Sequence, residues 1–207
     1  MTTTPTDLPD WYQQLCEFFP VEELKCRAHL ESLLSNPDQN HYHLLQTPEF
    51  ILIYVNHPGL NFIHIDYLYV LPAMRRQGIG SKIINMLKDQ YPNHLIILEA
   101  ETEDCPEDRE MIAKRLLFYQ QHGFQCGRSI AYERIHVITK LPIHLNIHFY
   151  VPNTGLTHQD SVVDPEYSAF LAFKWVYQNI HSHRSIEWYG VDYEPVEQVT
   201  WWRKSND

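Results

Sequence analysis

The chain has 207 residues, 44% hydrophobic and 20% charged, in the proportions of an ordinary globular protein of one domain. Its 13% aromatic content excludes a mostly disordered chain, and its net charge of −10 argues against a nucleic-acid binder, which needs a basic surface. No apolar run reaches the ~18 residues of a membrane span, and residues 1–10 lack the basic and apolar regions of a signal peptide. We therefore expect a cytoplasmic protein with no nucleic-acid or membrane partner.

The residue pattern predicts strands and helices in mixed order. Strands are indicated by short runs rich in β-branched and aromatic residues, and helices by apolar residues at every third or fourth position. In chain order, strands are expected at 11–19, 41–46, 50–56, 61–71, 95–101, 130–135 and 145–150. Helices are expected at 21–34, 79–91, 111–122 and 167–180, and 186–207 has no clear type. This order favours an α/β sheet covered by helices, in a single domain over 1–207 with 141–207 as its C-terminal strand, helix and aromatic tail.

The strand at 61–71 leads into a basic turn that contains two glycines. In the strand, alternation places His64 and Asp66 on one face, and Pro72 ends the ladder because it has no N–H to donate. The turn reads Arg-Arg-Gln-Gly-Ile-Gly-Ser-Lys from 75 to 82 and opens the helix at 79–91. The first turn of a helix has free N–H groups and a partial positive charge, so this arrangement suits a phosphate.

Two familiar phosphate-binding loops do not fit this turn. The P-loop pattern GxxxxGK[ST] fails because Lys82 lies two residues after Gly80 and no glycine precedes at the required distance. The dinucleotide pattern GxGxxG fails because its third glycine position is Ile83. The phosphate site therefore belongs to another class.

Cysteines and histidines give no sign of a metal site. The four cysteines are scattered and form no CxxC pair: Cys16, Cys26, Cys105 and Cys126. His-x-His pairs occur at 41–43 and 181–183, but spacing fixes no third ligand for either pair. We expect no metal in this protein.

Acidic residues gather in one short segment. Between 99 and 110 there are seven acids against one base, Arg109. The acids are Glu99, Glu101, Glu103, Asp104, Glu107, Asp108 and Glu110. Such a run is usually a solvated face, but it also raises the local concentration of cations.

The turn and a later helix together resemble one family. Arg75-x-x-Gly78-x-Gly80 resembles the [QR]-x-x-G-x-[GA] pyrophosphate loop of the GNAT superfamily of acyl-CoA-dependent N-acyltransferases. Residues 117–124, Leu-Phe-Tyr-Gln-Gln-His-Gly-Phe, look like the family's FYxxxGF segment. The resemblance covers about residues 11–150 and the helix that follows, and it leaves the last ~20 residues outside.

The resemblance implies a fold and a binding mode for acetyl-CoA. It implies a mixed, mostly antiparallel sheet that is flanked by helices and splayed between its fourth and fifth strands. The pantetheine arm would pair with the main chain of Tyr69, Val70 and Leu71. The pyrophosphate would lie over the amides of Arg76, Gln77, Gly78, Ile79, Gly80 and Ser81. Arg75, with the Arg76 side chain as a second candidate, would add charge-assisted hydrogen bonds.

Catalytic roles are implied in the same way. Tyr119 matches the tyrosine that protonates the leaving thiolate in many members, although a core aromatic remains the alternative. Asp66 and His64 match positions from which relatives deprotonate the amine. Glu99 and Glu101 are alternatives, the first as base and the second as an anchor for a cationic substrate. Two departures stand out: Ile112 replaces an Asn that often holds the pantetheine arm, and Arg115 replaces a small residue.

These features predict an N-acetyltransferase that moves an acetyl group from acetyl-CoA to a primary amine by direct attack in a ternary complex. The acidic run suggests a small cationic amine. The alternatives are a non-catalytic acyl-CoA sensor or partner subunit, and a peptide or protein N-acetyltransferase. A second copy of the chain is a candidate partner, because many relatives dimerise.

Overall fold

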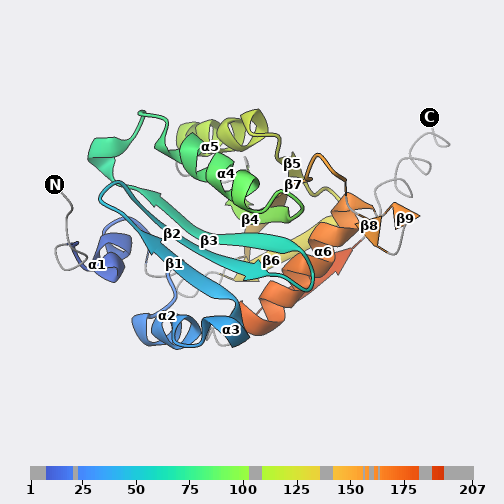
Figure 1. The fold of residues 1–207 in the computed structure, drawn as a ribbon, viewed down its shortest axis with the longest axis horizontal. Coiled ribbons are helices and arrows are strands. Elements are labelled where there is room, and N and C mark those ends of the chain that lie inside the picture. Colours follow the sequence, from blue (N-terminus) through green and yellow to red (C-terminus); the bar gives the residue numbers. More distant parts are fainter. Residues whose placement is uncertain are drawn as a thin grey trace.

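A computed structural model describes residues 8–20, 23–102, 109–135, 142–155, 157–158, 161–162, 164–181 and 188–193. Within these residues a central eight-stranded sheet has the order β1-β2-β3-β4-β7-β6-β10, with β5 also paired to β7 (Figure 1). The strands are β1 (Tyr42–Gln46), β2 (Phe50–His57), β3 (Phe62–Val70), β4 (Leu95–Glu101), β5 (Gln125–Cys126), β6 (Ile130–Ile135), β7 (Pro142–Tyr150) and β10 (Trp188–Tyr193). The β3–β4 pair is parallel and the other described pairs of this sheet are antiparallel. A separate hairpin joins β8 (Thr157–His158) to β9 (Ser161–Val162).

Helices cover both faces of the sheet. They are α1 (Trp11–Cys16), α2 (Arg27–Leu34), α3 (Pro37–Asn40), the 3-10 turn η2 (Pro72–Met74), α4 (Ile79–Gln90), α5 (Arg109–Gln121), α6 (Pro165–Val176) and the π-helical turn η3 (Tyr177–His181). In Figure 1, α4 and α5 lie on one side of the sheet, and α2, α3 and α6 lie on the other. Each side has its own apolar core, one built around α4 and the other around α1, α2 and α6. No helix in the described part of the chain is long and apolar enough to cross a membrane.

The expected mixed sheet with flanking helices is confirmed, and most elements lie where the sequence predicts them. The expected strand at 11–19 is wrong, because this segment begins with the helix α1. The Asp10 side chain accepts a hydrogen bond from the Gln13 N–H at 2.9 Å, which caps the helix, and Trp11 and Tyr12 pack on the core from it. The strand β10 lies in the segment to which the sequence assigns no type.

The sheet opens between β3 and β4. Their parallel pairing joins Phe62–Ile65 to Leu95–Leu98 and goes no further. Beyond that point β3 continues along β2, and β4 continues along β7. The predicted splay is therefore present, but it lies between the third and fourth strands of the chain because the segment at 11–19 is a helix.

A β-bulge at Asp66 changes which side chains of β3 share a face. Ile53 pairs with Tyr67 while Tyr54 pairs with Ile65, so Asp66 is one residue more than β2 can match. The regular alternation predicted for this strand consequently breaks there. Tyr67 packs in the core on the α6 side, together with Phe62, whereas strict alternation would put these two residues on opposite faces.

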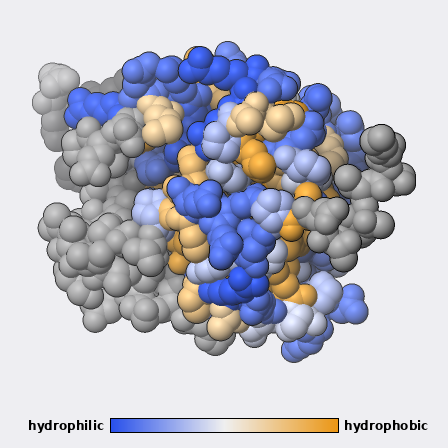
Figure 2. Space-filling view, turned by 90° about the vertical axis from the view of Figure 1, so that its left-hand side faces the viewer, coloured by the Kyte–Doolittle hydropathy of each residue, from blue (hydrophilic) through white to orange (hydrophobic). Residues whose placement is uncertain are grey.

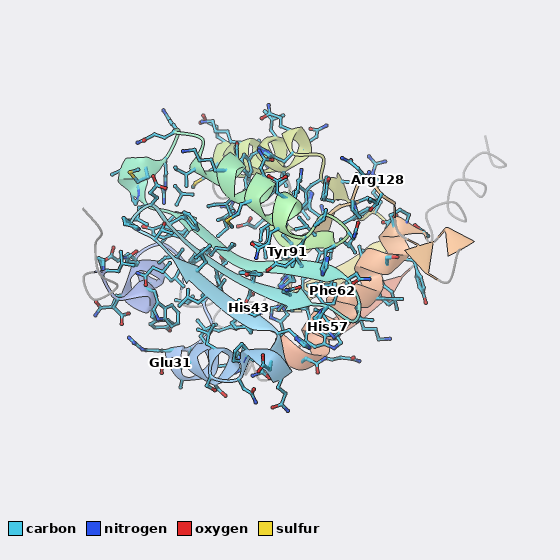
Figure 3. All side chains as sticks on the ribbon, in the orientation of Figure 1. Glu31, His43, His57, Phe62, Tyr91 and Arg128 are labelled. Atoms are coloured by element: carbon cyan, nitrogen blue, oxygen red, sulfur yellow. The ribbon has the colours of Figure 1, made fainter. Side chains whose placement is uncertain are left out.

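Aromatic rings fix α6 to the sheet near the start of β3. His57 and Phe62 stack with their ring centroids 5.4 Å apart (Figure 3). Trp175 of α6 packs edge-on against His57 at 4.7 Å and against Phe62 at 5.9 Å. The helix begins after Asp164, whose side chain accepts from the Glu166 N–H at 2.9 Å. The turn η3 at its far end then places His181 in the core, with 1% of its surface exposed.

Candidate active site

The turn between β3 and α4 is built around two residues with left-handed backbone. Gly78 has φ +77° and is the N-cap of α4, and Arg76 has φ +60°. Glycine suits the first position because it adopts positive φ without the steric cost that a Cβ atom brings. This backbone path directs the start of α4 toward the open end of the splay.

The main-chain amides of residues 76–81 donate to no backbone carbonyl within the described part of the chain. Arg75 N–H donates to the Pro72 carbonyl at 3.3 Å, and Lys82 N–H donates to the Gly78 carbonyl at 3.0 Å. Between them, the described residues provide no backbone acceptor for the six intervening amides. A recess of about 280 Å³ lies over them. It is lined by Val70, Met74, Arg75, Arg76, Gly78, Ile79, Gly80, Ser81 and Phe118.

Gly80 allows α5 to approach the start of α4. A Cβ atom on Gly80 would lie 3.1 Å from Cζ of Phe118, which is closer than most real Cβ contacts. Because Phe118 also lines the recess, α5 forms one wall of it. Figure 2 views the molecule from the end that bears α1 and this turn, where apolar strips run between hydrophilic elements.

The side chain of Arg75 is held by the protein itself. Its Nε donates to the Val70 carbonyl at 3.0 Å, and its guanidinium lies 4.8 Å from the centroid of the Phe18 ring. Two of its guanidinium nitrogens, Nη1 and Nη2, remain available for a phosphate. Arg76 is exposed beside it.

The strand edge expected to receive the pantetheine arm is only partly available. Leu71 N–H donates to the Glu49 carbonyl at 3.0 Å, and Tyr69 pairs with Ile51. By the alternation of an antiparallel ladder, the main-chain groups of Tyr69 and Leu71 point to β2 and those of Val70 point to the splay. The structure therefore does not fit the expectation that Tyr69 and Leu71 pair with the pantetheine arm. Of the three residues, Val70 can still pair with it.

Asp66 does not face His64 as the sequence suggested. The bulge directs its carboxylate to the ammonium of buried Lys25, with Nζ–Oδ distances of 2.7 and 2.6 Å, and to the hydroxyl of buried Tyr42. A carboxylate held by a buried cation is a poor proton acceptor. The expected relay between His64 and Asp66 is thus not formed.

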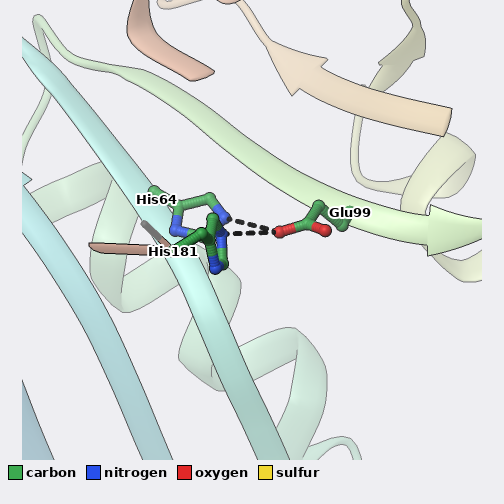
Figure 4. A group of neighbouring side chains, drawn as sticks. All are labelled: His64, Glu99 and His181. Atoms are coloured by element: carbon green, nitrogen blue, oxygen red, sulfur yellow. Dashed lines mark ion pairs between the residues drawn. The ribbon is translucent and has the colours of Figure 1, made fainter. Parts of the chain in front are cut away.

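Instead, His64 and Glu99 meet a third residue, His181. His64 Nε2 lies 3.7 Å from Glu99 Oε1, and His181 Nε2 lies 3.1 Å from the same oxygen (Figure 4). Both imidazoles are almost fully buried, whereas 16% of the Glu99 side chain is exposed. The other oxygen, Oε2, accepts a hydrogen bond from the Tyr132 hydroxyl at 3.0 Å. We call His64, Glu99 and His181 the His–Glu–His cluster.

The cluster lies where the sheet opens. Ile65 and Leu98 are the last paired residues of β3 and β4, so Glu99 is the first residue of β4 beyond the pairing. Burial raises the pKa of Glu99, but the nearby imidazoles, His181 first, outweigh this and hold that pKa well below its ordinary value. Glu99 is therefore an anion at the apex of the splay.

The acids that follow Glu99 have partners of their own where the structure describes them. Arg115 of α5 bonds Glu101, and Lys114 bonds Glu110 at 2.5 Å. The sequence left open whether Arg115 meets a phosphate or an acid, and here it meets an acid. Glu103, Asp104, Glu107 and Asp108 lie outside the described residues.

Tyr119 lies on the face of the sheet opposite the His–Glu–His cluster. Its ring packs beside Phe124 and His148, with centroid distances of 5.7 and 6.2 Å, in the core around α4. Burial raises the pKa of the phenol, and the Glu101 charge raises it further against the opposing effect of Arg115. The hydroxyl is therefore a neutral donor at physiological pH. Ile112, at the position of the absent Asn, is 3% exposed and belongs to the packing of α5.

Proteins of one known family resemble this chain in sequence and in fold. The profile of the acetyltransferase (GNAT) domain matches residues 38–126. The Bacillus subtilis (strain 168) protein named "Putative acetyltransferase YjbC" is 36% identical over 196 residues, which cover 92% of this chain and 91% of that protein. A solved structure of a GNAT-family protein from Bacteroides thetaiotaomicron matches with a TM-score of 0.62 at 20% identity, over 84% of this chain and 90% of that one.

The chain belongs to the GNAT family of acetyltransferases. The expected family is thereby confirmed. Two residues of the site escaped the sequence interpretation: Tyr132, and His181 as the partner of Glu99. His181 appears in the sequence only as half of a His-x-His pair, and no periodicity connects a residue at the end of α6 with the middle of β3.

Proposed function

We propose that the protein transfers the acetyl group of acetyl-CoA to the nitrogen of a primary amine. The observation that carries this proposal is the set of unpaired amides at residues 76–81 beside the open end of the splay. A diphosphate over these amides would gain hydrogen bonds and the favourable end of the α4 dipole. Arg75 and Arg76 would add positive charge.

The pantetheine arm would then run from the recess into the gap between β3 and β4. Val70 offers its main chain to that gap, although its carbonyl already accepts from Arg75. The thioester would lie near the apex of the splay. There it would have the His–Glu–His cluster on the α6 face and Tyr119 on the α5 face.

This placement supports a separate proton acceptor and proton donor. The substrate amine is protonated at neutral pH and must lose a proton before its nitrogen lone pair can attack the thioester carbonyl. The His–Glu–His cluster would take that proton, directly or through a water molecule. The carbon–nitrogen bond forms, the carbon–sulfur bond breaks, and Tyr119 would give its proton to the leaving thiolate. The nitrogen of the new amide would lose its extra proton, which would restore the Tyr119 phenol through water. The phenol's raised pKa keeps it protonated for this step.

A small cationic amine remains our proposed acceptor. The argument rests on the acids at 103, 104, 107 and 108, because the charges of Glu101 and Glu110 are already balanced by Arg115 and Lys114. Glu101 would serve as an anchor only by sharing its carboxylate with Arg115. An acceptor with two or more ammonium groups fits such an acidic region best.

The test is an acceptor screen with the purified chain. Acetyl-CoA is offered with polyamines, amino sugars, aminoglycosides, neutral amines and short peptides, and both CoA release and acetylated product are measured. We expect N-acetylated product, formed fastest with the polycationic small amines. Turnover confined to neutral amines would remove the electrostatic argument, and binding of acetyl-CoA without any product would indicate a sensor.

A further inference from the structure

We propose that the His–Glu–His cluster binds one divalent transition-metal cation of the zinc type. The three side chains come from β3, β4 and the turn after α6, and their nitrogen and oxygen atoms all lie within 4.8 Å of one another. Two histidines and one carboxylate form a ligand set that proteins use for zinc and related metals. Nothing in the sequence spacing indicated this set, because its members lie far apart in the chain.

The two nitrogen–oxygen separations are compatible with ligands that share one cation. Zinc–ligand bonds of roughly 2.0–2.1 Å place neighbouring tetrahedral ligands about 3.3–3.4 Å apart. The two measured nitrogen–oxygen separations, 3.7 Å for His64 and 3.1 Å for His181, fall on either side of this value. At 3.7 Å the contact of His64 with Glu99 is too long for a hydrogen bond.

His64 gives an independent reason to expect a ligand. Its side chain is fully buried, yet neither of its ring nitrogens has a hydrogen-bond partner in the described part of the chain. A buried polar atom without a partner costs free energy, and a bound cation would satisfy it. Its neighbour Phe173, with ring centroids 6.1 Å apart, offers no polar group.

The surroundings are suited to hold the cation and leave it accessible. The Tyr132 hydroxyl bonds Oε2 of Glu99 and thereby orients Oε1 toward the two imidazoles. Three protein ligands would leave a fourth position open. Glu99 is partly exposed and is the first residue of β4 beyond the parallel pairing, so solvent reaches this ligand. Imidazole nitrogen favours zinc, cobalt or nickel over calcium or magnesium, which prefer all-oxygen sites.

A cation here would also deepen the catalytic proposal, and that part rests on the proposed function. A water on the open position would ionise more readily than bulk water. The resulting hydroxide would accept the proton of the substrate ammonium, giving neutral amine and metal-bound water. Cation binding itself does not depend on this role.

The experiment measures metal binding by the full-length protein without reference to turnover. Protein stripped with EDTA and dialysed is titrated with Co²⁺, followed by visible absorption, and with Zn²⁺ in competition. We expect one cation per chain, and at least tenfold weaker binding in His64→Ala, Glu99→Gln and His181→Ala. His148→Ala, which removes a buried histidine outside the cluster, should bind like wild type.

Further measurements separate the possible failures. Tyr132→Phe keeps all three ligands and should weaken Co²⁺ binding roughly 10- to 100-fold, so the proposal stays testable if a ligand variant does not fold. A folded wild-type protein that takes up neither cation would overturn the metal site, as would unchanged affinity in folded ligand variants. Acetyl-CoA binding to the stripped protein is measured in parallel. Acetyl transfer by the stripped protein would remove the catalytic role of the cation and leave the site itself to the titrations, whereas metal binding without acetyl-CoA binding would contradict the proposed function alone.

Discussion

Tyr119 and Glu99 hold opposite protonation states for reasons that lie in their immediate neighbours. Tyr119 lies among rings and near the Glu101 carboxylate, and both influences favour the neutral phenol. Glu99 lies between two imidazoles that favour its anion despite burial. At the same pH, Tyr119 can therefore donate a proton and the Glu99 anion can stabilise a positive charge.

Tyr119→Phe should lower kcat about 100-fold, because it removes the donor to the leaving thiolate while keeping the ring. In the wild type the raised pKa keeps the phenol protonated, so activity should persist to about pH 10 and fall only above it. The variant should lack that alkaline decline. Steady-state kinetics from pH 7 to 11 checks both points, and equal turnover at every pH would remove Tyr119 from the mechanism.

Gly78→Ala should reduce the free energy of unfolding by about 1 kcal/mol. A Cβ atom there meets nothing within 4 Å, so the cost comes only from the φ of +77°. Gly78→Asn is the matched control, because Asn tolerates this conformation better and should cost less. Urea unfolding measures both variants. An alanine variant as stable as wild type would show that the left-handed turn is not needed.

At the scale of elements, the bulge in β3 and the opening beside β4 decide which residues can react. The bulge turns Asp66 to Lys25 and Tyr42, and the end of the parallel pairing leaves Glu99 beside the gap. The N-terminal helices are thereby tied to the sheet by a buried ion pair. The same strand contributes a structural carboxylate and a histidine of the His–Glu–His cluster two residues apart.

Lys25→Met should destabilise the fold by roughly 3–5 kcal/mol, since it removes the ammonium paired with a buried carboxylate. The double variant Lys25→Met with Asp66→Leu should cost much less, because neither charge is then buried. Urea unfolding of the two variants gives the comparison. If Asp66→Asn instead kept full stability but lost acetyl transfer, the carboxylate would be catalytic and our structural assignment wrong.

The sequence predicted the elements of the site better than their contacts. The turn at 75–82 and α4 were predictable because local chemistry dictates them, through glycine at positive φ and a helix start. The end of α5 was predictable through its resemblance to the FYxxxGF segment of the family. The bulge was not, because apolar and aromatic residues occupy consecutive positions after Asp66, so the change of face there is not visible in the sequence pattern. The aromatic residues of 11–19 have high strand propensity and predict a strand, whereas the Asp10 cap starts a helix there. His181 joins the site only through the tertiary packing of α6.

At the scale of the whole molecule, buried histidines link stability to pH. Burial lowers the pKa of His43, His57, His94 and His148 in the folded chain. As the pH falls through the ordinary histidine value near 6.5, the unfolded chain therefore binds protons before the folded chain does. The contribution of these histidines to the free energy of unfolding is therefore complete above about pH 6.5 and is lost as the pH falls below it.

Unfolding by urea at pH 7.5, 6.5 and 5.5 should show a free energy that decreases with each step, with EDTA present to keep cations away from the cluster. His148→Gln should flatten the slope, because the most buried of these four histidines is then absent. A stability that rose toward pH 5.5 would mean that these histidines are not held neutral in the fold.

The most direct measurement of the central claim is a crystal structure of the protein with CoA. The account predicts diphosphate oxygens within roughly 2.7–3.2 Å of the main-chain nitrogens of residues 76–81, and the thiol between β3 and β4 near Glu99. A diphosphate bound elsewhere, with these amides facing only solvent, would contradict it.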